Sequence, residues 1–209
     1  MNTPATMQTL PNPSLDVALC AISSDQLERF LAVWTASADQ DRSGAVLAGL
    51  SLSYDGAILT IAATDGKILV EETLATDNLH REVWSVIIAN DAMKTLKAWV
   101  KSIPLSHRVT IARGPKSIRL VCSGAAIELR TVEGNFPQYK MALSLEGKAN
   151  PVEYVGLNVE YMARLHKLWK GQGNAMRCDM RRGIICKPMR LSNFCLSQVA
   201  LVMPISLPT

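Results

Sequence analysis

Residues 47–74 restrict the possible fold more than any other segment of the chain. They read LAGLSLSYDGAILTIAATDGKILVEETL, with the alternation of apolar and polar residues that is typical of half-buried β-strands. Two Asp-Gly pairs, Asp55-Gly56 and Asp65-Gly66, interrupt this alternation. Because Asp-Gly between alternating segments is the strongest short-range signal for a tight hairpin, the segment predicts three antiparallel strands joined by two short turns.

An amphipathic helix is predicted before these strands, over SSDQLERFLAVWTASA, residues 23–38. Ser23 and Gln26 have the spacing of a capping box, in which each side chain accepts a hydrogen bond from a backbone N–H of the other residue. The apolar residues behind them recur at helical spacing and share one face: Leu27, Phe30, Leu31 and Trp34. The first unit of the fold is therefore a helix followed by strands.

The same order of elements occurs twice more. After a strand over residues 82–89, Asn90 and Asn158 are the expected N-caps of a second and a third helix. The later elements are helix 91–102 with strands 108–113, 117–123 and 126–133, and helix 159–170 with strands 175–181, 187–192 and 198–207. The chain is therefore predicted to be an α+β protein of three repeated units, each a helix followed by about three antiparallel strands.

The repetition also predicts the domain organisation. Two units make one compact domain, so we expect a complete domain over residues 17–147 and half of a similar domain over residues 151–209. Residues 1–16, with three prolines among small polar residues, are expected to be a flexible tail. Half a domain leaves an open sheet edge and an unpaired apolar helix face, so an isolated monomer is expected to risk aggregation.

Composition and motifs argue against several classes of protein. The 209 residues include no apolar run near the roughly 18 residues of a membrane span, and the N-terminus lacks the features of a secretion signal, so a cytoplasmic protein is expected. Five cysteines without a C-x-x-C pair fit small apolar core residues better than disulfides or a zinc site. Motifs for nucleotide binding or nucleophilic catalysis are absent, and His80, His107 and His166 lack metal-ligand spacing. We therefore expect no enzyme, no catalytic residues, no metal and no cofactor.

Basic residues recur on the second and third helices. They are spaced to share one face of each helix: Lys94, Lys97 and Lys101 on the second, and Arg164, Lys167 and Lys170 on the third. An ordinary solvated surface explains such a stripe on a single helix. Two equivalent helices that both carry one favour a surface that contacts DNA phosphates without regard to base sequence, and the net charge of +4 is compatible with this.

The segment EGNFPQY, residues 133–139, places aromatic residues in a loop of a chain that is only 5% aromatic. Pro137 fixes its own backbone and favours an extended conformation of the residue before it, so Phe136 is held in a defined direction. Taken alone, the segment is explained either as a turn closed by an aromatic plug or as part of a binding site.

Several segments together resemble the bacterial DNA polymerase III beta subunit, the beta sliding clamp. They are VLAGLSLSYDGAILTIAATDGKILVEETL, VIIANDAMKTLKAWV, IELRTVEGNFPQYKMAL and VALVMPISL. The A-T-D-G turn, the G-x-F-P-x-Y segment and the final V-M-P are among the most recognisable strings of that family, and they occur here in the family's order. The similarity covers roughly residues 18–145, matching the clamp's middle domain, and about 151–207, matching the latter half of its last domain.

This resemblance implies a DNA-clamp fold, in which helices line the central hole of a ring and sheets form its rim, so that the basic stripes face double-stranded DNA. It also implies a pocket at the junction of the middle and last domains for clamp-binding peptides of polymerases and other partners, of the Gln-x-x-Leu-Phe kind. The residues that match the pocket wall are Leu47, Thr64, Gly66, Lys67, Ile68, Leu69, Pro137, Met141, Ala142, Leu201, Met203, Pro204 and Ile205. In this interpretation Phe136 and Tyr139 fix the loop, and Pro137 contributes to the groove.

Three parts of the expected pocket depart from the family's pattern. Lys67-Ile68-Leu69 stands where His-Arg-Leu is usual, Met141 replaces a basic residue, and the C-terminal M-P-M-R-L pattern has become M-P-I-S-L. The expected pocket is therefore more apolar and less basic than is usual in the family.

Three hypotheses for function remain open. The preferred one is a shortened sliding clamp that encircles DNA as a homo-oligomeric ring, serves as a processivity factor in replication or repair, and has a clamp loader as a further possible partner. Since one chain supplies only three units, we expect a homotetramer built as a dimer of dimers, with a stable dimer as the next alternative. The second hypothesis is a non-encircling clamp mimic that binds or sequesters clamp-binding peptides. The third is an enzyme or an unrelated binding module.

Overall fold

The computed structural model describes residues 18–36, 40–143, 156–169, 176–179, 189–193 and 198–203. The predicted tail over residues 1–16 lies outside these ranges, as do Lys170, Pro204 and Ile205. No helix in the described ranges is long and apolar enough to cross a membrane.

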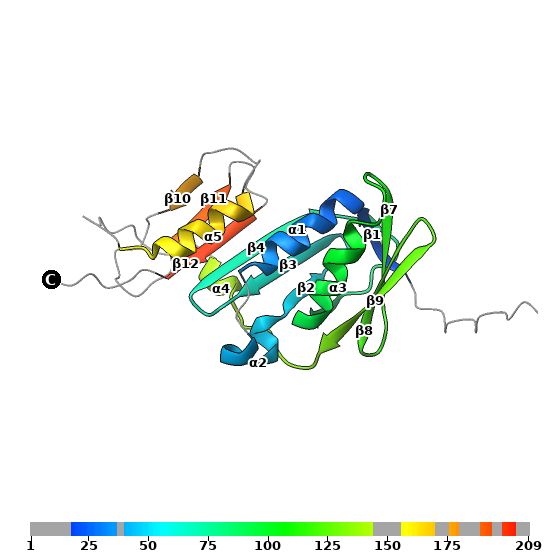
Figure 1. Ribbon diagram of the computed structural model, residues 1–209, viewed down its shortest axis with the longest axis horizontal. Helices are drawn as coiled ribbons and strands as arrows, with labels where there is room; N and C mark the ends of the chain where they lie inside the picture. The colour runs from blue at the N-terminus through cyan, green and yellow to red at the C-terminus, as the bar shows by residue number, and fades with distance from the viewer. Residues whose placement is uncertain are drawn as a thin grey trace, which may run out of the picture.

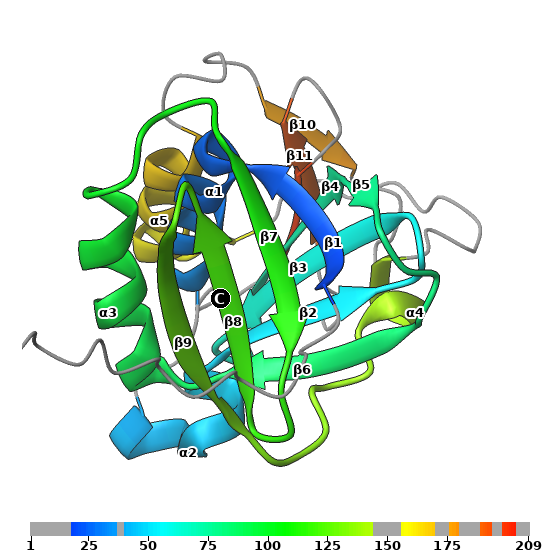
Figure 2. The ribbon, with the colours of Figure 1, turned by 90° about the vertical axis from the view of Figure 1, so that its right-hand side faces the viewer.

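Three helices of eleven residues each lie on the same side of the strands (Figure 1), and a view at right angles shows them together along one side of the molecule (Figure 2). These helices are α1 (Ser24–Trp34), α3 (Asn90–Val100) and α5 (Val159–Trp169). Helix α1 contacts both of the others and so lies between them. The shorter helices are α2 (Gln40–Ala48) and α4 (Lys140–Leu143).

The described strands form one continuous sheet, and every pairing is antiparallel. In chain order they are β1 (Ala18–Ser23), β2 (Leu50–Tyr54), β3 (Ile58–Thr64), β4 (Ile68–Ala75), β5 (Asp77–Asn78), β6 (Trp84–Ile88), β7 (Arg108–Arg113), β8 (Ser117–Cys122), β9 (Ala125–Val132), β10 (Met176–Asp179), β11 (Met189–Asn193) and β12 (Gln198–Val202). Their order across the sheet is β10-β11-β12-β4-β3-β2-β6-β9-β8-β7-β1-β5. The third unit therefore joins the rest of the sheet where β12 pairs with β4.

The prediction of an α+β fold with three helix-and-strand units is confirmed. Helices α1, α3 and α5 are each followed by three main strands: β2–β4, β7–β9 and β10–β12. Both Asp-Gly hairpins form as predicted. In the first, the Asp55 carboxylate accepts hydrogen bonds from the N–H groups of Ala57 and Ile58, and these bonds lower the pKa of Asp55. A carboxylate that caps its own turn stabilises this hairpin through local hydrogen bonds.

The helix starts agree with the predictions at two of three places. The backbone N–H of Ser23 donates to Gln26 Oε1 at 2.9 Å, as the capping box predicts, and the N–H of Glu160 donates to Asn158 Oδ1 at 2.8 Å. The predicted N-cap role of Asn90 is wrong, because α3 already includes Asn90. The Asn90 side chain instead accepts a hydrogen bond from the indole N–H of Trp34 at 3.0 Å, so a contact between two helices replaces the local cap.

The apolar faces of all three long helices contribute to one core. The prediction of an unpaired apolar face on the third helix is wrong, because its apolar residues are buried in that core: Tyr161, Leu165, Leu168 and Trp169. Contact between α5 and α1 covers part of this face, which a count of units could not foresee. The prediction of an open sheet edge holds in the described part of the chain, where the outermost strand β10 pairs only with β11.

The cysteines follow the prediction only in part. Cys20 and Cys122 are buried as predicted, and burial raises the pKa of Cys20 to about 12. Cys178 is exposed on the edge strand β10, so the prediction of a core position is wrong there. An edge strand has one neighbour instead of two, and this difference in sheet position is not visible from cysteine spacing.

Candidate peptide-binding site and helix face

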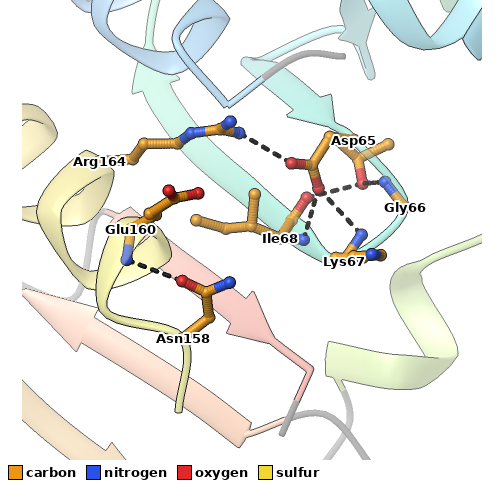
Figure 3. Close-up of polar contacts among 8 residues, drawn as sticks. Asp65, Gly66, Lys67, Ile68, Asn158, Glu160 and Arg164 are labelled. Carbon is orange, nitrogen blue, oxygen red and sulfur yellow. Dashed lines mark hydrogen bonds and ion pairs between the residues drawn. The ribbon is translucent and has the colours of Figure 1, made fainter. Parts of the chain in front are cut away.

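The turn between β3 and β4 lies at the centre of the candidate site (Figure 3). Asp65 Oδ1 accepts hydrogen bonds from the backbone N–H groups of Lys67 at 2.9 Å and Ile68 at 2.7 Å. Gly66 has a φ of 84°, in the left-handed region that glycine adopts without strain. The A-T-D-G sequence therefore contains both the acceptor and the flexible residue that this turn requires.

Thr64 fixes the same turn from its strand side. Its side chain is buried, and its Oγ1 donates to the carbonyl of Ile68 at 2.8 Å and accepts from the N–H of Gly66 at 3.0 Å. Both hydrogen bonds are internal to the turn. Thr64 therefore shapes the site through the backbone.

Strand β12 brings the third unit directly beside β4. Leu201 lies opposite Leu69 in the antiparallel register, and both side chains are more than nine-tenths buried. Beyond the end of β12, the N–H of Met203 donates to the carbonyl of Lys67 at 2.9 Å. The C-terminal strand and the A-T-D-G turn thus form one continuous surface, although they are far apart in the sequence.

The loop over residues 133–139 forms the next part of this surface. It passes close to α2, since a Cβ atom on Gly134 would lie 2.6 Å from Cγ2 of Val46. The rings of Phe136 and Tyr139 then pack edge to face, with centroids 5.9 Å apart and planes at 89°. Aromatic pairs favour this geometry, and the pair holds the chain on both sides of Pro137.

Glu71 of β4 anchors the end of this loop. Its carboxylate accepts a hydrogen bond from the Tyr139 hydroxyl, and Lys140 Nζ lies 2.5 Å from Glu71 Oε2. Burial and the nearby Glu71 both raise the pKa of Tyr139, so its hydroxyl stays protonated and can donate. One carboxylate of β4 therefore fixes both the aromatic pair and the start of α4.

Helix α5 reaches the same turn through Arg164. Its guanidinium Nη1 lies 2.8 Å from Asp65 Oδ2, the carboxylate oxygen that does not bind the turn amides (Figure 3). The Asp65 side chain is 15% exposed and that of Arg164 is 41% exposed. The ion pair is therefore partly shielded from water.

A second polar contact crosses the junction on the inner side of β4. Glu72 is fully buried, its Oε1 pairs with Arg29 of α1, and its Oε2 accepts a hydrogen bond from Gln198 of β12 at 2.6 Å. Burial raises the pKa of Glu72, while Gln198 and Arg29 oppose that shift. Neither sequence periodicity nor motif comparison predicted this contact, because its members come from three separate elements.

The helix side of the molecule carries an uneven distribution of charge. Lys94, Lys97 and Lys101 are exposed on or directly after α3, and Lys167 is exposed on α5. Between these helices lies α1, which exposes Asp25 and, one helical turn later, Glu28. Hydrogen bonds from Ser106 lower the pKa of Asp25, so this acid is ionised at neutral pH. The sequence predicted the basic stripes but not the acidic helix between them.

A cleft of about 450 Å³ lies elsewhere, at the opposite end of β3 from the A-T-D-G turn. Tyr54, Trp84 and Arg113 line it together with hydroxyl side chains. It contains none of the residues of the predicted pocket wall and is a separate feature of the surface.

Comparison with known proteins identifies the family. Residues 21–138, more than half of the chain, match the family described as DNA polymerase III beta subunit, central domain. The chain belongs to this family. No curated protein is significantly similar to the chain over its sequence.

Solved beta clamp structures share the fold. The DNA polymerase III beta subunit of Thermotoga maritima superposes with a TM-score of 0.77 at 14% identity, covering 98% of this chain and 70% of that one. A putative DNA polymerase III beta subunit from Eubacterium rectale gives 0.73 at 12% identity, covering 90% and 65%. The Pseudomonas aeruginosa sliding clamp bound to griselimycin gives 0.73 at 18% identity, covering 97% and 68%. The DNA-clamp fold is therefore shown, and this chain spans 65–70% of the length of these clamps.

Most residues of the predicted pocket wall lie on the segments that meet at the β4–β12 junction, and Leu47 lies on α2. Exposed or half-exposed parts of this wall are Leu47, Gly66, Lys67, Pro137, Met141, Ala142 and Met203. The side chains of Leu69 and Leu201 form a nearly buried layer beside them. Ile68 differs, because its side chain is 1% exposed and belongs to the central core, so only its backbone contributes to the turn.

Two residues that hold the β4–β12 junction in place were not among the predicted site residues. Glu71 fixes the aromatic loop, and Asp65 fixes the turn and pairs with Arg164. Asp65 is visible in the sequence as part of the Asp-Gly signal, but its second partner is 99 residues away. Arg164 was predicted to face DNA, and the structure places its guanidinium against Asp65 of the A-T-D-G turn.

Proposed function

We propose that this protein is a sliding-clamp-type processivity factor without enzymatic activity, which encircles double-stranded DNA and holds partner proteins through a peptide site at the β4–β12 junction. The observation that carries this proposal is the junction itself. Three separate segments meet there: the A-T-D-G turn, the end of β12, and the Phe136–Tyr139 loop anchored on Glu71. Membership of the clamp family and the clamp fold support the same function.

The proposed ligand of the junction is a short peptide with Leu and Phe anchors, of the Gln-x-x-Leu-Phe kind. Met141 is 83% exposed, and Met203 is partly exposed beside the covered pair Leu69 and Leu201. Flexible thioether side chains next to an apolar layer adapt well to such anchors. We expect micromolar affinity, about −8 kcal/mol, as for other small transient contacts. The Pseudomonas aeruginosa clamp bound to griselimycin shows that a relative takes a ligand.

The proposed DNA surface is the side that carries α1, α3 and α5. The exposed lysines of α3 and Lys167 of α5 can contact phosphates of any base sequence. Three helices on one side of a curved sheet, with strands on the other, match the arrangement that the clamp family places around DNA.

A ring requires more than one copy of this chain. In the described residues the sheet ends at β5 on one side and at β10 on the other. Exposed edge strands tend to pair with further strands, so we propose a homotetramer, with a dimer as the next alternative, that closes the ring through these edges. A cytoplasmic location and a clamp loader as a further partner belong to the same proposal.

A second candidate function is a non-encircling clamp mimic that binds or sequesters clamp-binding peptides. The observation that favours it is the acidic surface of α1, where Asp25 and Glu28 weaken attraction to phosphates in the middle of the helix face.

Retention on DNA of different topology separates the two functions. A ring stays on covalently closed circular DNA at high salt and slides off after the circle is cut, whereas electrostatic binding is lost from both at high salt. Light scattering should show an oligomer for the ring. A monomer that binds the peptide but is not retained on circular DNA would support the mimic and reject the ring.

A further inference from the structure

The ion pair between Arg164 and Asp65 joins the DNA-side helix α5 to the turn that forms part of the peptide site. It is the contact in Figure 3 that links two elements remote in sequence, since the other dashed lines stay within the turn or within the start of α5. A contact of this kind restricts the position of α5, in the third unit, relative to the β3–β4 turn.

Asp65 uses its two oxygens for different purposes. Oδ1 accepts from the N–H groups of Lys67 and Ile68, and Oδ2 faces Arg164. The carbonyl of Lys67 in turn accepts from the N–H of Met203. A rotation of the Asp65 carboxylate would therefore break hydrogen bonds that hold the backbone next to both Lys67 and Met203, two residues of the proposed pocket wall.

The Arg164–Asp65 ion pair is less exposed to water than an ordinary surface ion pair. The ion pair between Arg130 and Asp91 has both side chains more than half exposed, and exposed pairs of that kind contribute little. Asp65 is only 15% exposed, so water replaces a lost partner less readily. Without Arg164, the Oδ2 atom loses its charged partner at a site where the Asp65 side chain itself is poorly hydrated.

We propose that Arg164 is a positioning residue of the peptide pocket, which acts through Asp65 to hold the β3–β4 turn and Met203 in the shape that binds a partner peptide. This inference rests on the proposed peptide-binding function. It also assigns Arg164 a role different from a phosphate contact, while Lys167 on the same helix keeps its exposed charge.

The test compares four variants of the full chain by fluorescence anisotropy with a labelled peptide that carries Gln-x-x-Leu-Phe. Arg164→Gln removes the charge, and Asp65→Asn removes the charge while keeping an oxygen for the turn amides. Arg164→Lys keeps a cation that can reach one oxygen, and Lys167→Gln is the matched control on α5. We expect Arg164→Gln and Asp65→Asn each to weaken binding about 3- to 10-fold, Arg164→Lys to restore most of it, and Lys167→Gln to leave it unchanged.

The double variant Asp65→Asn with Arg164→Gln separates positioning from direct contact. If Arg164 acts through Asp65, the double variant binds as weakly as either single variant, because the pair can be broken only once. If Arg164 touches the peptide itself, its loss weakens binding further in the Asp65→Asn background, and that result would overturn the proposal. Equal affinity of wild type and Arg164→Gln would overturn it as well.

Amide hydrogen exchange provides a readout that needs no peptide. We expect faster exchange at Lys67, Ile68 and Met203 in Arg164→Gln, and unchanged exchange on the remote strand β8. If wild type binds no peptide, the proposed function fails, and exchange still tests the positioning of the turn. Unchanged exchange at these three amides would reject the role of Arg164 whatever the peptide result.

Discussion

Leu69→Ala tests the covered apolar layer beside the proposed peptide site. The Leu69 side chain is 7% exposed and lies opposite Leu201 in the register of β4 and β12. Alanine lacks three carbon atoms of leucine, and about 0.8 kcal/mol for each carbon atom removed from a buried site gives about 2.4 kcal/mol. Because the neighbouring strand cannot close the gap fully, we expect unfolding to become easier by about 2–3 kcal/mol.

The same substitution should weaken peptide binding as well as folding. A gap below Met203 and the turn leaves the Leu and Phe anchors of a peptide with fewer contacts, so we expect a loss of about 10-fold, or about 1.4 kcal/mol, in affinity. Urea unfolding followed by circular dichroism measures the first effect. Titration calorimetry, at a temperature where both proteins are folded, measures the second.

Leu129→Ala is the matched control for this experiment. Leu129 is fully buried in β9, which pairs with β8 and lies away from the β4–β12 junction. The Leu129→Ala variant should lose at least as much stability as Leu69→Ala, and it should bind the peptide with wild-type affinity. Equal peptide affinities for wild type and Leu69→Ala would refute the location of the site. A loss of stability below about 0.5 kcal/mol would refute the packing argument.

Three further predictions concern other parts of the molecule. The double variant Lys94→Glu with Lys97→Glu should be retained less on circular DNA, and its retention should depend less on salt, while its peptide affinity stays the same. Unchanged retention would make α3 an ordinary solvated helix. Burial raises the pKa of Glu72 above 4.5, so the contribution of Glu72 to stability is full below pH 4.5 and is lost as the pH rises through the raised pKa. Glu72→Gln should therefore flatten the dependence of melting temperature on pH in that range. Parallel curves for wild type and Glu72→Gln would contradict this. Gly134→Ala should loosen the loop, since its new Cβ lies 2.6 Å from Val46 Cγ2 at a φ of 146°. Unchanged amide hydrogen exchange at Tyr139 with unchanged peptide affinity would oppose it.

The sequence predicted the elements whose signals are local. Alternation and Asp-Gly turns gave β2, β3 and β4 within a few residues, because the Asp55 and Asp65 carboxylates bind amides of their own turns. Helix α2 was missed, and the expected strand began at Leu47 where the structure still has helix. This helix is short and broken at Gly44, so packing against neighbouring elements has to stabilise it.

The spacing of residues along the sequence did not predict contacts between distant segments. A helical stripe identified Arg164 as basic and solvent-facing, but a long side chain can reach a partner beside the helix as well as one in front of it. The structure shows that its partner is Asp65. Motif comparison likewise placed Ile68 in the pocket wall, although alternation along β4 already put Leu69 and Ile68 on opposite faces.

Strand β4 contributes one face to the core and the other to the proposed peptide site. Its side chains alternate, so Leu69 and Glu71 point to the face with the aromatic loop, while Val70 and Glu72 point to the core and to Arg29. Changes on the first face should therefore alter the proposed peptide site directly. Changes on the second face should alter the junction with β12, which forms part of the proposed site, so the position of β12 links the two faces without shared side-chain contacts.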